Sequence, residues 1–102
     1  MGTAQPLTNR LQLQARLAER TPLRYTPAGV AAQDVVLEHE SVQAEAGSPR
    51  RVALRLKAVA FGVQAEQLAS LALGSVVLCR GFLASPRRGH GIVFHIQAFE
   101  PQ

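Results

Sequence analysis

Three cationic side chains recur at even spacing in the segment 51–57. Arg51, Arg55 and Lys57 alternate with apolar residues, and Ala53 fills the remaining position of the same phase. Alternate residues of a β-strand point to one face, so these cations would form a flat positive stripe. A stripe of this kind can follow the phosphates of a single nucleic-acid strand, with counterion release as the driving force. The spacing therefore predicts a nucleic-acid contact on this strand.

Further candidate residues fall in two segments that are rich in turn-forming residues, 21–29 and 84–91. We expect the arginines and the lysine to contact phosphates and Tyr25 to stack on a base. The residues assigned to this interface are Arg24, Tyr25, Arg50, Arg51, Arg55, Lys57, Arg87, Arg88 and His90.

Other kinds of site find little support in the sequence. It contains no glycine-rich phosphate loop that leads into a helix and no Gly-x-Ser-x-Gly turn. His39 and Ser41 can point the same way in one strand, but strand residues two apart rarely form a nucleophile–base pair. Cys79 is far in sequence from the histidines and no zinc spacing occurs, so we expect a small buried hydrophobe. We therefore expect neither catalysis nor a metal or other cofactor.

Composition supports a binding protein. The chain has 102 residues, enough for one domain with a modest core, and its formal net charge is +4. Ten of its eleven cations are arginine, whose planar fork and flat face suit phosphates and bases. A GC-rich genome would also enrich arginine, so composition alone leaves both interpretations open.

Membrane contact is not expected. No apolar run approaches the ~20 residues that span a bilayer. The helical segment 63–70 carries Glu66 and no lysine or arginine, unlike a membrane-surface helix. A single cysteine fits a reducing compartment. We expect a cytoplasmic protein.

Hydrophobic patterning predicts the elements that position these residues. Alternation predicts strands at 11–17, 30–42, 51–60, 75–83 and 91–99, and helix-forming residues predict one short helix at 63–70. Residues 43–49 contain Gly47 and Pro49 and predict a hairpin connection longer than a tight turn. In the last strand the side chains expected to point inward are Ile92, Phe94, Ile96 and Ala98.

The order of these elements predicts an all-β fold. We expect residues 1–8 to be a flexible arm and residues 9–102 to form a single domain. Five strands with a short helix between the third and fourth are typical of the five-stranded Greek-key barrel called the OB-fold. Gly81 suits a strand that bends where the barrel closes. A five-stranded sandwich with an inserted helix is the alternative.

Several short blocks carry a family resemblance that spans about Thr8 to Glu100. They are Thr8–Leu11, Arg20–Arg24, Val36–His39, Ser41–Gln43, Glu45–Gly47 and Gly81–Phe82. Together they resemble the primosomal replication protein N (PriB) family of small bacterial OB-fold proteins. The resemblance implies a homodimer that binds single-stranded DNA and lies between the restart helicase (PriA) and the helicase-loader adaptor (DnaT). It implies no enzymatic activity.

The resemblance also assigns positions. Arg24 and Tyr25 match the basic first-loop site of the family, and Arg87 with Arg88 match its lysine-bearing last loop. Ala53 stands where the best-studied branch carries a base-stacking aromatic residue, and the last loop is shorter. Because stacking contributes about 1–3 kcal/mol per base, its loss would weaken binding.

Three further residues affect the predicted function. The guanidinium planes of Arg51 and Arg55 could replace the missing ring, while Glu40 stands where some relatives place a cation. These departures and the modest net charge keep a second hypothesis open, a protein–protein adaptor module with weak or incidental nucleic-acid binding.

Overall fold

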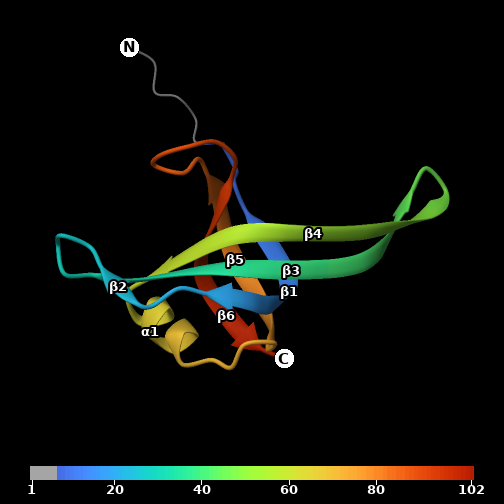
Figure 1. Cartoon of the computed structure of the whole chain (residues 1–102). Coiled ribbons are helices and arrows are strands. Elements are labelled where there is room, and N and C mark those ends of the chain that lie inside the picture. Colours follow the sequence, from blue (N-terminus) through green and yellow to red (C-terminus); the bar gives the residue numbers. More distant parts are fainter. Residues whose placement is uncertain (1–6) are drawn as a thin grey trace, which may run out of the picture.

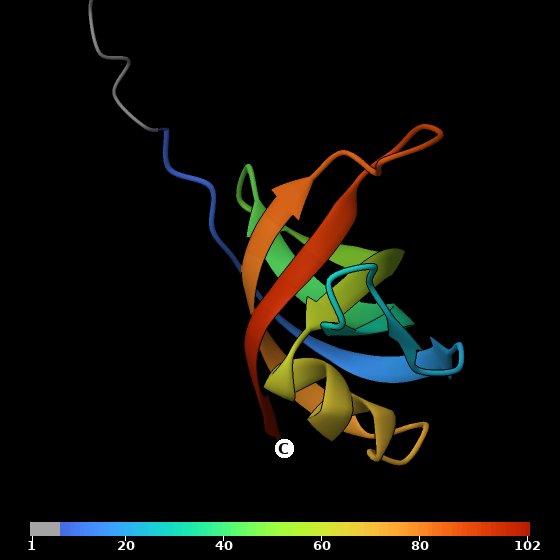
Figure 2. The ribbon, with the colours of Figure 1, turned by 90° about the vertical axis from the view of Figure 1, so that its left-hand side faces the viewer.

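Five long strands close into a ring in the computed structural model, which describes residues 7–102. Around the ring the order is β1–β5–β6–β4–β3, and a pairing of β1 with β3 completes it. The strands are β1 (Leu11–Arg20), β2 (Arg24–Tyr25), β3 (Ala31–Glu45), β4 (Ser48–Phe61), β5 (Val76–Ala84) and β6 (Val93–Pro101), with one helix, α1 (Val63–Ala69). Figures 1 and 2 show the barrel from two sides. The predicted all-β barrel is confirmed, in place of the sandwich.

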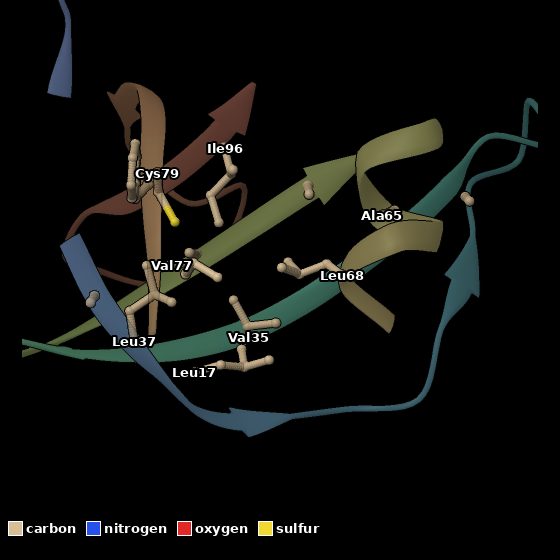
Figure 3. Close-up of a cluster of buried hydrophobic side chains, with 13 residues drawn as sticks. Leu17, Val35, Leu37, Ala65, Leu68, Val77, Cys79 and Ile96 are labelled. Carbon is tan, nitrogen blue, oxygen red and sulfur yellow. The ribbon is translucent and has the colours of Figure 1, made fainter. Parts of the chain in front are cut away.

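The inward faces of all five long strands fill the barrel. Leu17, Leu37, Val77 and Phe94 are fully buried there, and Leu68 of α1 packs against the same core. Figure 3 shows Leu17, Leu37 and Val77 among the inward side chains, with Leu68 of the helix at one end of the cluster. Because successive strand residues point to opposite faces, burying one face leaves the other free for a partner.

Two boundaries differ from the prediction near the start of the chain. The first strand was expected at 11–17 but continues to Arg20, because a bulge at Ala18 shifts its register against β3. The first loop contains a two-residue strand, β2, paired with Ala31 and Ala32. Of the arm predicted at residues 1–8, residues 1–6 lie outside the described part of the chain.

The hairpin between β3 and β4 was predicted wrongly. Strand pairing continues without interruption to Glu45 and Ser48, so only Ala46 and Gly47 form the turn. Both have positive φ angles, 51° and 78°, as a tight hairpin turn requires. The predicted long connection at 43–49 is therefore strand on both sides. Figure 1 shows this hairpin projecting well beyond the rest of the barrel.

A second bulge corrects the prediction for the last strand. Arg80 pairs with Ala98 but Gly81 pairs with Ile96, so Gln97 is an extra residue on β6. The inward phase shifts there, and Phe99 instead of Ala98 packs against the core. Ile92, also expected inward, precedes β6 and is 52% exposed.

Helix α1 is tied to β1 by Arg20. The Arg20 guanidinium donates to the carbonyl oxygen of Leu68 at 3.2 Å and also to that of Leu71. A cation suits the end of a helix, where carbonyl groups lack partners within the helix. No helix in residues 7–102 is long and apolar enough to cross a membrane.

Cys79 lies inside the barrel, as predicted for a small hydrophobe. Burial raises the pKa of its thiol from 9.0 to about 11. The thiol therefore stays protonated near neutral pH, and only the thiolate is a good nucleophile. We expect a thiol reagent at about pH 8 to modify Cys79 slowly in the native protein and rapidly after denaturation in urea. Equal rates in the two states would contradict this burial.

Candidate nucleic-acid interface

The outer side of β4 carries the predicted stripe. Arg51, Arg55 and Lys57 are all exposed and share the side of the strand that faces away from the core. Across the hairpin, however, this side also receives Glu38 and Glu40 of β3. The surface is therefore one of mixed charge, with acidic side chains beside two of the three cations.

Arg55 is held by two carboxylates. Its Nη1 donates to Oε2 of Glu38 on β3 at 2.6 Å, and its Nη2 donates to the carboxylate of Glu19 on β1. The hydrogen bond to Glu19, followed by the one to Glu38, raises the pKa of the Arg55 guanidinium. Arg55 thus links three strands, and a phosphate would have to displace a carboxylate to reach it.

The projecting hairpin carries two more ion pairs. Arg51 lies with Nη2 3.8 Å from Oε2 of Glu40, and Arg50 pairs with Glu45 next to the turn. All four side chains are well exposed, and surface pairs of this kind contribute about 0–1 kcal/mol to stability. They do, however, neutralise the positive charge that the strand pattern predicts.

The first loop separates its two predicted residues. Arg24 makes a bidentate contact with Asp34 of β3, at 2.6 and 3.1 Å, and this hydrogen-bonded carboxylate raises the pKa of Arg24. Tyr25, the next residue of β2, is 63% exposed. Of the two predicted residues in this loop, Arg24 is therefore paired with a carboxylate and the Tyr25 ring is exposed.

Three of the predicted cations have no ion-pair partner within residues 7–102: Lys57, Arg87 and Arg88. Arg87 and Arg88 lie in the exposed loop between β5 and β6, together with His90. Gly89 and Gly91, with φ angles of 86° and 98°, flank His90 and shape this loop. The free positive charge of the predicted interface is therefore gathered on mid-β4 and on the last loop.

His39 and Ser41 point the same way, as the strand spacing allows, and they form a hydrogen bond. The Ser41 Oγ lies 2.7 Å from Nε2 of His39, while Nδ1 donates to the carbonyl oxygen of Gln14 at 2.6 Å. Gln43 also donates to the Ser41 Oγ, at 2.9 Å. These bonds tie β3 to β1 and satisfy the ring. No metal-ligating cluster of three side chains occurs in the described part of the chain.

Known proteins share this sequence and fold. A family model described as "Another single-strand binding protein family" matches residues 9–98. Replication restart protein PriB of Bordetella pertussis is 48% identical over 80 residues, 78% of this chain and 75% of that protein. The Klebsiella pneumoniae protein of the same name is 35% identical over 99 residues, 92% of this chain and 94% of its own.

Solved structures agree with the sequence relatives. PriB from Ralstonia solanacearum, 42% identical, superposes with a TM-score of 0.85 over 94% of this chain and 100% of its own. The single-stranded DNA binding protein from Thermus aquaticus has a TM-score of 0.75 at 24% identity, over 93% of this chain and 50% of its own, and shows the fold alone. The chain belongs to the PriB family of OB-fold proteins.

Proposed function

We propose that this protein binds single-stranded DNA as a non-enzymatic accessory protein of replication restart in the bacterial cytoplasm. In this proposal it stabilises the restart helicase (PriA) on DNA and helps to recruit the helicase-loader adaptor (DnaT). It acts as a homodimer and needs no cofactor. Family membership supports the setting, since the relatives are named replication restart proteins.

The observation that carries DNA binding is the set of unpaired cations. Lys57 on β4 and Arg87 with Arg88 in the last loop lie on two of the elements that bind oligonucleotides in OB-folds. Unpaired cations release counterions on binding phosphates at no cost in broken ion pairs. The other predicted phosphate ligands, Arg24, Arg50, Arg51 and Arg55, have to exchange a carboxylate for a phosphate.

Titration of a labelled oligo-dT at physiological salt tests this function. We expect fluorescence polarisation to report a Kd in the micromolar range or tighter. The affinity should decrease as the salt concentration rises. Mass measurement of the same samples checks the dimer. An oligonucleotide that does not bind below about 100 μM would contradict the proposal.

A second function, a protein adaptor with incidental DNA contact, is favoured by one observation. Acidic residues on β1 and β3 neutralise Arg51 and Arg55, which leaves a surface of mixed charge typical of protein contacts. This hypothesis predicts firm binding to the restart helicase by a protein that binds oligo-dT weakly. The polarisation titration, repeated with labelled helicase in place of the labelled oligonucleotide, separates the two functions.

A further inference from the structure

Three aromatic rings from three different strands form a stack on the outside of the barrel. The rings of Phe82 on β5 and His95 on β6 are 4.8 Å apart between centroids and nearly parallel, with an interplanar angle of 14°. The ring of Phe61 at the end of β4 lies 6.0 Å from that of His95 at 30°. We call Phe61, His95 and Phe82 the aromatic row.

The row belongs to the outer surface and not to the core. Phe82 and His95 are directly paired across β5 and β6, and each follows a buried residue, Gly81 and Phe94 respectively. His95 is also the β6 partner of Val59, which lies between Lys57 and Phe61 on the outer side of β4. Phe61 is 42% exposed and forms the open end of the row.

Unpaired cations lie on one side of the aromatic row, where Lys57 and the loop between β5 and β6 are close in register. Lys57 shares the outer side of β4 with Phe61, four residues away, which is about 13 Å along a strand. Arg87 and Arg88 lie in the loop that joins β5, which carries Phe82, to β6, which carries His95. Aromatic rings beside a group of cations are an arrangement that binds the bases and phosphates of a single strand.

From this arrangement we infer that the aromatic row is a base-stacking platform, where a base of single-stranded DNA continues the stack at Phe61. The backbone then runs from Lys57 across β4 and β6 to the last loop. This path replaces the one expected over position 53, where the chain has alanine and the flanking arginines are paired with carboxylates. The inference rests on the proposed function and specifies where the bases lie.

A single tryptophan provides a direct test, because the natural chain contains none. Stacking of a base on tryptophan quenches its fluorescence, so Phe61→Trp should lose fluorescence when oligo-dT is added. The matched control is Leu73→Trp, since Leu73 is 55% exposed and lies between α1 and β5, away from the row. We expect no quenching in the control at an oligonucleotide concentration that saturates both proteins.

Affinity measurements give the second readout. Phe61→Ala should weaken oligo-dT binding about five- to 100-fold without changing its salt dependence, because a ring is lost and no cation. His95→Ala should weaken it in the same way, and circular dichroism would show that both variants keep the fold.

The outcomes separate this inference from the proposed function. If wild-type protein binds oligo-dT but Phe61→Ala binds equally well and Phe61→Trp is not quenched, the platform is wrong and DNA binding stands. If wild-type protein does not bind oligo-dT, the proposed function itself fails. A loss of salt dependence in Phe61→Ala would also overturn the platform, because it would indicate disturbed phosphate contacts.

Discussion

Replacing Lys57, Arg87 and Arg88 together by alanine is expected to weaken oligo-dT binding about 100-fold at ~0.1 M salt. These are the predicted phosphate ligands without an ion-pair partner in the described residues. Each phosphate contact to a single strand contributes about 0.7 to the slope of log K against log salt concentration. Losing all three should flatten that slope by about 2, which polarisation titrations at several salt concentrations would measure.

A matched control separates position from net charge. Arg80→Ala removes one cation from the middle of β5, where Arg80 pairs with Glu100 at 3.0 Å. Arg87→Ala removes one cation from the last loop and changes the net charge equally. We expect the slope to fall by about 0.7 for Arg87→Ala and to stay unchanged for Arg80→Ala. Equal slopes in the two variants would show that overall charge, and not the last loop, governs binding.

Gly81→Ala is expected to destabilise the barrel by about 3 kcal/mol or more, or to prevent folding. A Cβ atom at Gly81 would lie 1.8 Å from the carbonyl oxygen of His95 and 3.0 Å from the Phe94 ring. Both obstacles belong to β6, so the added methyl group would force β5 and β6 apart. Thermal unfolding should show a midpoint lowered by more than about 12 °C, given about 4–8 °C per kcal/mol for a domain of this size.

Gly29→Ala is the matched control for this prediction. Gly29 also tolerates alanine poorly in its backbone conformation, with φ at 83°, but no atom lies within 4 Å of the added Cβ. Its cost should therefore be limited to the strain of a left-handed alanine, about 1–2 kcal/mol. If both variants unfold at the same temperature, close strand contact at Gly81 does not determine the stability of the barrel.

The strands were predictable because most of their length buries one face, which gives an alternating pattern. The alternation at 51–60 set the side of β4 on which its cations lie, although the strand itself extends from Ser48 to Phe61. The hairpin turn was missed because Gly47 and Pro49 suggested a long loop, while the tight turn needs only Ala46 and Gly47. Proline lacks a backbone N–H, but not every position of an edge strand has to donate one, so Pro49 is tolerated.

That single error concealed the ion pairs. With the turn at Ala46 and Gly47, residues equally far from it face each other, which places Glu38 opposite Arg55. The carboxylate that neutralises Arg55 could thus have been found by counting from the correct turn. Glu19 could not, because it reaches Arg55 through the bulge in β1, which no local pattern indicates.

The aromatic row could not be predicted from sequence patterns either, because it depends on pairing between distant strands. Phe61, Phe82 and His95 are distant in the chain, and they meet because β4 pairs in parallel with β6 and β5 pairs antiparallel with β6. Contacts of this kind follow from barrel closure and not from the period of any one strand.

The projecting hairpin has a consequence for solubility. Beyond the barrel, residues 39–45 of β3 and 48–54 of β4 pair in the described sheet only with each other, so each has a bare outer edge. Bare edges invite the strands of other molecules and lead to aggregation. Charged side chains and a proline blunt such edges, and Glu40, Glu45, Pro49, Arg50 and Arg51 all lie on this hairpin. The charged residues whose ion pairs neutralise the positive charge of the hairpin therefore also protect it against edge-to-edge association.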